Sequence, residues 1–318
     1  MKLVVTEKND AAQKIADLLG ATKPKADKVY NTPVYRFTVD GEEWVTIGLR
    51  GHILEPDFAP VLTYRKTKGW MGVTEDGKTL PAQLPDTLAK PPFKKKKPFT
   101  EDSVELKAWK MDALPYLVYA PIEKLPKEKD IIRSLKNLAK KADSIVIATD
   151  FDREGELIGS DALSCIKEVN DTAPVSRARY SAFTKEEITH AFSNLVELDT
   201  DLASAGASRQ DIDLIWGAVL TRYLTLVKFA GYGNVRSSGR VQTPTLALIV
   251  ARERERLAFV PEDYWVIKGA FDSGATVGPT DGDGELAFEA PYEHARLKTQ
   301  EEADAVMANV EGVHSARV

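Results

Sequence analysis

The sequence predicts an α/β domain with a mostly parallel sheet and flanking helices, then a mainly helical domain, and last the start of a β-rich domain. Short apolar strands alternate with amphipathic helices as far as residue 182. Long helical patterns dominate residues 183–260, and β-like segments return in residues 261–318. Alternating strands and helices are typical of βαβ units, whose strands pair in parallel, so we expect three domains with these boundaries.

The first domain opens with an apolar strand at residues 3–6. A helix follows in which alanine, isoleucine and leucine recur at helical spacing up to Gly20, a residue that commonly ends helices. Residues 29–39 and 43–49 are predicted strands, and Asp40-Gly41 between them is a hairpin turn signal. From residue 51 to about 126 proline and glycine recur without a sustained apolar period, so the sequence predicts little structure there.

The pattern becomes clear again after residue 126. Thr184 and Glu187 have the spacing of a capping box and predict a helix that runs to residue 195. The remaining predicted elements are helices at 128–142, 155–168, 205–228 and 242–257, strands at 144–149 and 175–182, and β-like segments from Tyr264 onward.

Composition excludes several classes of protein. Of the 318 residues 43% are hydrophobic and 29% charged, close to the average soluble domain, and no apolar run is long enough to cross a membrane. A single cysteine excludes a disulfide framework and a multi-cysteine zinc finger. The N-terminus lacks the features of a secretory signal, so we expect a cytoplasmic protein without a membrane partner and, as the simplest oligomeric state, a monomer.

The net charge of −5 argues at first against a nucleic-acid partner, whose phosphates attract lysine and arginine. The charge is unevenly distributed, however. Residues 205–260 hold 8 basic and 4 acidic side chains, whereas residues 261–318 hold 4 basic and 12 acidic ones. The segment before the acidic C-terminal region is therefore basic enough to meet a phosphate backbone.

The strongest local signal is an apolar strand that ends in three acids, Asp150, Asp152 and Glu154. Because side chains alternate along an extended chain, the two aspartates are expected on one side, with Glu154 following into a helix. Clustered carboxylates repel one another unless a cation lies between them, and hard oxygen ligands suit Mg²⁺. The carboxyl ends of strands are also where α/β sheets bind ligands.

Two other interpretations of these acids exist. Asp150, Asp152 and Glu154 fit the first positions of an EF-hand loop, but position 12 is Asp161 instead of glutamate, and a strand precedes the loop instead of a helix. The second is a solvated acidic turn after a core strand. We favour metal-dependent phosphoryl chemistry, because Glu7 also ends an apolar strand and adjacent parallel strands would bring it, with the positive charge of Lys8, to the same point.

These residues, taken together with two later motifs, resemble the type IA DNA topoisomerases, closest in style to archaeal members and topoisomerase III. Glu7-Lys8 and the Asp150–Glu156 segment look like the two halves of that family's Toprim motif. Gly51-His52 is similar to its Gly-His element, and Ser237-Ser238-Gly239-Arg240-Val241-Gln242 resembles the stretch that opens a DNA-binding helix. The resemblance covers about residues 1–265.

The resemblance implies Mg²⁺-dependent, ATP-independent cleavage and rejoining of one DNA strand through a 5′-phosphotyrosine, with single-stranded or locally melted DNA as partner. Glu7 would move the proton of the 3′ oxygen and Lys8 would stabilise charge on the phosphate. Glu7, Asp150, Asp152 and Glu154 would form the metal site. The DNA contacts implied are His52, Arg153, Arg209, Arg236, Ser238, Gly239, Arg240 and Gln242.

Some assignments stay open at this point. His52 is either a hydrogen-bonded structural residue or a DNA contact. Arg222 is a further cation for phosphates, and Trp216 and Tyr223 could stack on bases, although Trp216 lies in an apolar pattern that favours the core. The lysine run 94–97 favours a solvated loop over a phosphate contact.

None of the ten tyrosines lies in the Thr-Tyr-x-Arg-Thr-Asp context of that family's nucleophile, and Thr63-Tyr64-Arg65 is only superficially similar. We therefore expect the N-terminal portion of such an enzyme, able to bind DNA and metal without turnover. A Toprim nuclease or primase would share Glu7 and the acidic cluster but would not need the Gly239-Arg240-Val241-Gln242 stretch. A non-catalytic DNA-binding protein is the third hypothesis.

Overall fold

A computed structural model describes residues 1–65, 67–89, 103–229, 234–276, 285–293 and 296–313. The lysine run 94–97 lies outside these residues. The chain forms two compact units, residues 1–245 and 246–318, which are described separately. This division differs from the three predicted domains, whose boundaries stay a prediction. Within the described part of the chain, no helix is long and apolar enough to cross a membrane.

The first unit is built around a six-stranded sheet with the order β12-β11-β1-β4-β3-β2. The pairs β12-β11, β11-β1 and β1-β4 are parallel, and the β4-β3-β2 edge is antiparallel, so the sheet is mixed with a parallel centre. Its strands are β1 (Lys2–Thr6), β2 (Lys25–Val29), β3 (Thr32–Val39), β4 (Glu42–Gly48), β11 (Ser144–Ile147) and β12 (Val175–Arg177).

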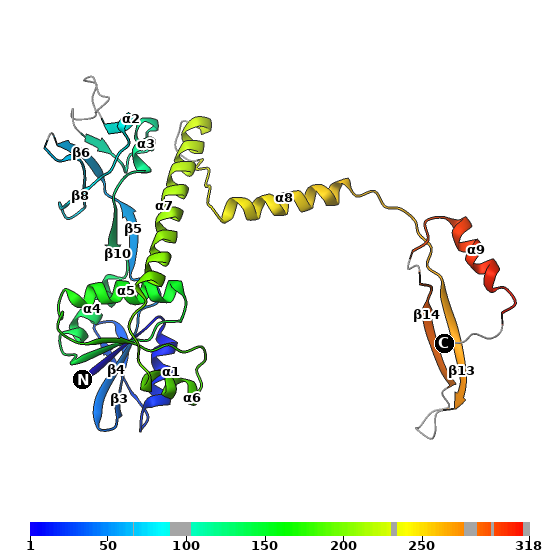
Figure 1. The fold of residues 1–318 in the computed structure, drawn as a ribbon, viewed down its shortest axis with the longest axis horizontal. Coiled ribbons are helices and arrows are strands. Elements are labelled where there is room, and N and C mark those ends of the chain that lie inside the picture. Colours follow the sequence, from blue (N-terminus) through cyan, green and yellow to red (C-terminus); the bar gives the residue numbers. More distant parts are fainter. Residues whose placement is uncertain (66, 90–102, 230–233, 277–284, 294–295, 314–318) are drawn as a thin grey trace. The chain divides into compact units, whose positions relative to one another are not determined.

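Helices cover both faces of this sheet (Figure 1). Alternate residues of the central strands face opposite sides, so Leu3 and Val5 pack with α4 and α5, while Val4 packs with α1 and α6. The helices that follow the strands are α1 (Asn9–Leu19), α4 (Lys129–Ala139), α5 (Arg153–Lys167) and α6 (Lys185–Ser193). The α/β domain with flanking helices is therefore confirmed.

Local differences from the predicted elements have clear backbone causes. The predicted strand 29–39 is two strands, because Tyr30 adopts a positive φ of 50° and turns the chain. The predicted strand 175–182 ends at Arg177. Thr184 caps α6 through Glu187 N–H, but the Glu187 carboxylate accepts from Ser181 instead of closing the capping box.

Residues 54–126, where the sequence predicted little, form a second β structure. An antiparallel ribbon of β5 and β10 leaves the first sheet and leads to a four-stranded antiparallel sheet with the order β8-β7-β6-β9 (Figure 1). Its short strands and frequent turns explain the weak pattern. The elements are β5 (Leu54–Phe58), β6 (Val61–Arg65), β7 (Gly69–Val73), β8 (Thr79–Pro81), α2 (Asp86–Ala89), β9 (Ser103–Glu105), a 3₁₀ turn (Met111–Ala113), α3 (Leu114–Leu117) and β10 (Ile122–Pro126).

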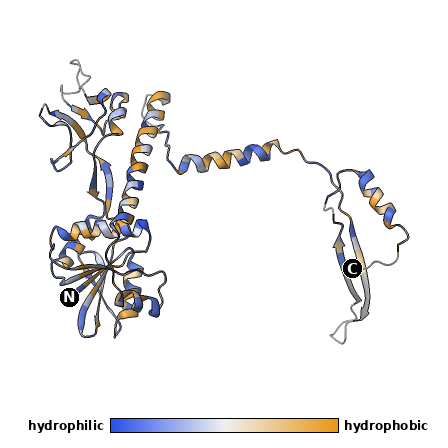
Figure 2. Cartoon of the chain, in the orientation of Figure 1, coloured by the Kyte–Doolittle hydropathy of each residue, from blue (hydrophilic) through white to orange (hydrophobic). Residues whose placement is uncertain are grey.

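The long helix α7 (Thr200–Phe229) joins these two β structures. Its first half packs against α5, and its later half packs against α3 and the core of the four-stranded sheet. Figure 2 shows hydrophobic residues recurring along α7 with hydrophilic ones between them. The helix thus packs against both β structures, and several of its apolar side chains stay exposed.

The second unit holds most of α8 (Gln242–Ala258), the hairpin of β13 (Lys268–Thr276) and β14 (Glu285–Pro291), and α9 (Gln300–Val310). Thr299 and Glu302 form a complete capping box at the start of α9, a helix that the sequence analysis did not predict. A β-bridge between Trp265 and Leu297 fixes the segment before the hairpin to the segment after it.

Candidate metal centre and nucleic-acid interface

The candidate site lies where the parallel strands β1 and β11 end side by side. Val5 is paired with Ile147, so the residues that follow each strand, Glu7 and Asp150, leave the sheet at the same edge. Lys8 Nζ lies 3.2 Å from Glu7 Oε1 and 3.7 Å from Asp150 Oδ2. The hydrogen bond to the Glu7 carboxylate is the largest of the effects that raise the pKa of Lys8. The lysine is therefore fully charged at this edge.

A buried network holds the Asp150 loop from beneath. Arg177 is fully buried and forms an ion pair with the equally buried Glu156 at 3.1 Å. The Arg177 guanidinium also donates to the carbonyl oxygens of Ile147, Ala178 and Asp150. Tyr180 Oη donates to the Ala148 carbonyl, and burial raises the pKa of this phenol, which keeps it protonated as a donor. These buried side chains thus hold the acid-bearing loop through its backbone carbonyl groups.

The tight turn into α5 explains the sequence Asp150-Phe151-Asp152-Arg153-Glu154-Gly155. A Cβ on Gly155 would lie 2.0 Å from the Asp150 carbonyl oxygen, so only glycine fits there. Asp152 is the N-cap of α5 and accepts from Gly155 N–H at 2.7 Å. Arg153 and Glu154 follow as the first helical residues.

The Gly51-His52 element approaches from the end of β4. Gly51 has a φ of 89°, a conformation that favours glycine, and its N–H donates to the Glu7 carbonyl at 2.9 Å. This turn brings His52 Nε2 to 3.3 Å from Glu154 Oε2. The amide nitrogen of Gln210 lies 3.3 Å from both ring nitrogens of His52. His52 is therefore hydrogen-bonded, while its contact with DNA stays a prediction.

Two arginines, Arg209 and Arg240, contact acids on or beside α7 next to this site. Arg209 donates to Glu154 Oε1 at 2.7 Å and lies 3.9 Å from Asp213 Oδ2. Arg240 forms a bidentate ion pair with Asp213, with N–O distances of 2.7 and 3.2 Å. The ion pair with Arg240 lowers the pKa of Asp213 and raises that of Arg240. Both guanidiniums are partly exposed and lie along one helix.

The Ser238–Gln242 segment is attached to α7 by side-chain and backbone contacts. Ser238 N–H donates to Thr221 Oγ1 at 3.0 Å, and Thr221 Oγ1 donates back to the Ser238 carbonyl. Gln242 accepts from Ser237, and Gly239 N–H donates to Thr243 Oγ1. The backbone N–H of Arg236 donates to Thr225 Oγ1. Arg153 lies apart from this segment, at the start of α5.

The acids do not converge on one point as the strand periodicity predicted. Within the residues that the structure describes, no group of three acid, histidine or cysteine side chains is arranged to hold a metal ion. Each acid instead has its own partner: Lys8 pairs with Glu7 and Asp150, Arg209 pairs with Glu154, and the Gly155 N–H donates to Asp152. The donor set still fits Mg²⁺ by its chemistry, because it consists of carboxylate oxygens at a partly exposed sheet edge.

The predicted core position of Trp216 is wrong. Trp216 is 48% exposed, because the core beneath α7 is filled by Leu214, Ile215 and Ala218 on the adjoining side. Arg222 donates to the Leu106 carbonyl, lies over the Trp109 ring and is half-buried, which lowers its pKa, and its contact with a phosphate stays a prediction. Tyr223 is exposed as well.

Sequence reasoning also missed several residues of this site. Arg177, Gln210 and Asp213 contact the predicted site residues Asp150, His52 and Arg240, respectively. Glu156 pairs with Arg177, and Tyr180 donates to the Ala148 carbonyl in the segment that leads to Asp150. The available signal was weak. Glu156 and Arg177 lie in elements that carry other polar residues, so their sequence neighbours do not mark them as buried, and charged residues are buried only when they are paired.

Comparison with known proteins identifies the family. Residues 2–183 match the Toprim domain and residues 197–318 match a family described as DNA topoisomerase. DNA topoisomerase 1 of Archaeoglobus fulgidus is 38% identical over 274 residues, which are 85% of this chain and 34% of that protein. DNA topoisomerase 1 of Thermoplasma acidophilum is 34% identical over 311 residues, 98% of this chain and 33% of that protein.

The fold agrees with these matches. The full-length topoisomerase I from Thermotoga maritima superposes with a TM-score of 0.50 and 21% identity, over 96% of this chain and 37% of that one. The chain thus spans about a third of the length of the relatives that it matches. With a Toprim domain over more than half of its length and a topoisomerase domain after it, the chain belongs to the type IA DNA topoisomerase family.

Proposed function

We propose that this chain supplies the metal-binding and strand-binding part of a topoisomerase that cleaves and rejoins one strand of DNA. The observation that carries the proposal is the Glu7-Lys8-Asp150 group at the ends of adjacent strands, next to a helix whose Arg209 contacts Glu154 of the same acidic segment. Cleavage of a phosphodiester needs positive charge next to the phosphate oxygens and a group that exchanges a proton. This edge of the sheet offers exposed cations for the first need and carboxylates for the second.

Each residue then has a distinct task. Lys8, which is 65% exposed, places its ammonium next to the scissile phosphate as a point charge. Glu7, which is far less exposed, carries the proton to and from the 3′ oxygen. Glu7, Asp150, Asp152 and Glu154 would hold Mg²⁺, which when bound would supply positive charge that orients the phosphodiester. Arg209 and His52 hold Glu154 in position.

The DNA strand is expected along α7 and the Ser238–Gln242 segment. Arg240 and Arg209 would release Asp213 for phosphate oxygens while Arg209 keeps Glu154; Ser238, Gly239 and Gln242 lie in the segment, and Arg236 lies just before it. Partly exposed ion pairs are worth only about 0–1 kcal/mol, so such an exchange costs little. Arg153 stands at the start of α5, where an anion is favoured by the helix dipole.

Strand cleavage needs a nucleophile, which we do not assign within these 318 residues. Tyr64 lies in β6 with its ring 5.5 Å from that of Trp70, in the four-stranded sheet. We therefore expect the purified chain with Mg²⁺ and end-labelled single-stranded DNA to form no covalent protein-DNA product after denaturation. Loss of a covalent product on Tyr64→Phe would contradict this, whereas release of a free labelled fragment would favour a Toprim nuclease.

DNA binding is tested directly by titration of labelled single-stranded and blunt duplex oligonucleotides at several salt concentrations. We expect tighter binding to the single strand and a fall in affinity with salt. Arg240→Gln should weaken binding and reduce the salt slope by roughly 0.7, the value for one phosphate contact on a single strand. Arg36→Gln is the matched control, because Arg36 also bridges two exposed acids, Asp27 and Glu43, but on the antiparallel edge of the sheet.

Equal losses for Arg36→Gln and Arg240→Gln would mean that only overall charge matters. Tighter binding to the blunt duplex than to the single strand would contradict the placement of a strand along α7.

A further inference from the structure

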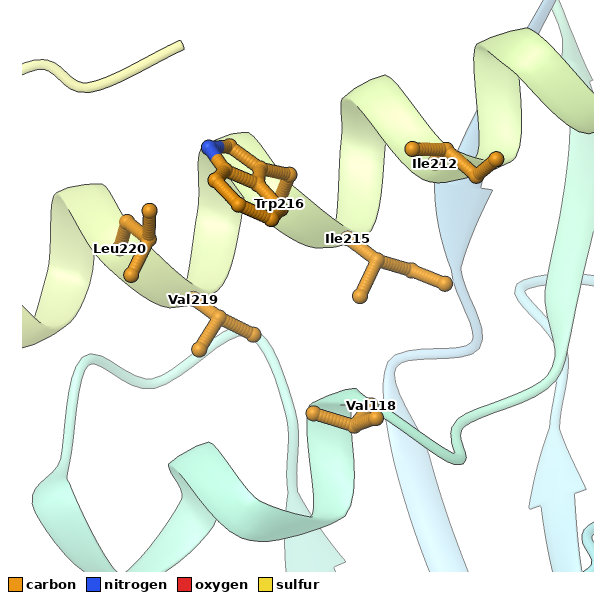
Figure 3. A pocket seen from close by; sticks show the side chains of 6 residues that line it. All are labelled: Val118, Ile212, Ile215, Trp216, Val219 and Leu220. Atoms are coloured by element: carbon orange, nitrogen blue, oxygen red, sulfur yellow. The ribbon is translucent and has the colours of Figure 1, made fainter. Parts of the chain in front are cut away.

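An apolar groove lies between α7 and the end of α3 (Figure 3). Its volume is about 300 Å³. Trp216 is the only aromatic side chain among its lining residues, and the ring is half exposed. The lining consists of Val118, Ile212, Ile215, Trp216, Val219 and Leu220.

The groove adjoins the arginine-bearing segment proposed to follow the DNA backbone. Trp216 lies three residues after Asp213, so the two side chains are neighbours on the surface of α7. Asp213 holds Arg240 in the bidentate ion pair, and Ser238 is bound at Thr221, about two turns further along the helix. A phosphate held by Arg240 would therefore lie beside the Trp216 ring.

The same helix leads from this groove to the acids. Arg209, which contacts Glu154, precedes Trp216 by seven residues, or roughly 10 Å along a helix. The space between them is lined by Ile212 and Asp213. The groove and Arg209 are thus on one helix, at a separation that a nucleotide or two can bridge.

We propose that Trp216 is a base-stacking residue: it receives one unpaired nucleobase of a DNA strand whose backbone runs past Arg240 toward Glu154. This inference rests on the proposed function and adds a residue to it. The size of the groove supports a single base, because a protein partner would bury on the order of 800 Å² on each side, far more than six side chains offer. The exposed indole face and the neighbouring arginine are the two groups that unpaired bases and their phosphates contact.

The test uses the full chain and two probes: an oligothymidylate, and an oligomer of the same length and charge made of abasic residues. Trp216→Ala should weaken binding of the oligothymidylate by about five- to 100-fold and leave binding of the abasic oligomer unchanged. Trp216→Phe should retain most of the affinity, since it keeps an aromatic face. Binding of oligothymidylate should also quench tryptophan fluorescence in the parent but less in Trp216→Ala.

Tyr30→Ala is the matched control, because Tyr30 is equally exposed but lies in the turn between β2 and β3. Far-ultraviolet circular dichroism and thermal unfolding of each variant show whether it is folded. Equal affinities of the parent and Trp216→Ala for oligothymidylate would overturn the stacking role, as would an equal loss on the abasic oligomer. If the parent binds neither oligomer, the proposed function itself fails.

Discussion

Two groups of charges lie at the end of β11, one sealed and one open. Arg177 and Glu156 are fully buried, and every contact they make is with the protein. Glu7, Lys8 and Asp150 are on the outer side of the same loop, and Lys8 is largely exposed. The sealed pair holds the loop in place from beneath, whereas the open group presents charges outward.

The difference follows from the cost of removing charge from water. A buried charge without a partner costs several kcal/mol, so the sealed pair cannot exchange partners. An exposed ion pair is worth about 0–1 kcal/mol. The acids can therefore exchange the lysine for a metal ion, and the lysine can exchange the acids for a phosphate, at small cost. The loop is therefore rigid in its backbone and adaptable in its side chains, which is the combination that a binding site needs.

The largest effect is expected when the sealed pair is broken. Arg177→Met leaves Glu156 buried without a partner and removes the donor to the Asp150 carbonyl, so the free energy of unfolding should fall by about 3–5 kcal/mol. Urea unfolding followed by circular dichroism measures this change. The double variant Arg177→Met with Glu156→Leu should recover part of the loss, because an apolar pair needs no charge compensation. A single-variant cost within about 1 kcal/mol, the range of exposed pairs, would refute the contrast.

The sequence predicted the open group better than the sealed one. Glu7 and Asp150 follow apolar strands, and the parallel pairing of those strands was enough to bring them together. Arg177 and Gln210 could not be assigned from the sequence, because their roles depend on contacts across 27 and 158 positions. The second β structure at residues 54–126 was missed because its short strands carry little periodicity. Trp216 was misplaced because the apolar residues of α7 do not all face the core beneath it.

A second prediction concerns metal binding by the open group. Mg²⁺ should raise the free energy of unfolding of the parent, by about 1.4 kcal/mol at a concentration ten times the dissociation constant. The double variant Asp150→Ala with Asp152→Ala should lose this dependence. Because Asp152 also caps α5, the metal-dependent change is compared, not the absolute stability.

The control is a double variant that removes two acids elsewhere, Asp27→Ala with Glu43→Ala, both of which pair with Arg36. Equal shifts with Mg²⁺ in all three proteins would show that the metal binds elsewhere.

Asp161 and Lys124 form a pair that is intermediate between the sealed and the open group. Asp161 on α5 is buried, and among the residues that the structure describes its Oδ2 atom has no hydrogen-bond partner. Its other oxygen pairs with Lys124 of β10, which is about one-third exposed. Burial raises the pKa of Asp161 above its ordinary value of 3.8, against the lowering effects of Lys124 and His52. Asp211 of α7, whose pKa burial also raises, is attracted by the same Lys124.

The sign of the pH dependence follows from this shift. Between the unfolded and folded pKa values of Asp161 the native state binds more protons, so this residue's contribution to stability falls as the pH rises through that window. Asp161→Asn has no proton to lose. Its stability relative to the parent should therefore increase as the pH rises from below 3.8, as measured by urea unfolding at several pH values. A relative stability that falls with pH would mean that Lys124 outweighs burial and that the pair behaves as an open one.

The smallest change in stability is expected at Lys8 itself. Lys8→Gln removes an exposed ammonium from Glu7 and Asp150, and the free energy of unfolding should change by less than about 1 kcal/mol. If Lys8 meets a phosphate, the salt slope of single-strand binding should fall by roughly 0.7. Lys78→Gln is the control, because Lys78 is also exposed and paired with an acid, Asp76, at 2.7 Å in another part of the unit. An unchanged salt slope in Lys8→Gln would remove Lys8 from the DNA interface, and a stability loss of several kcal/mol would place it with the sealed pair.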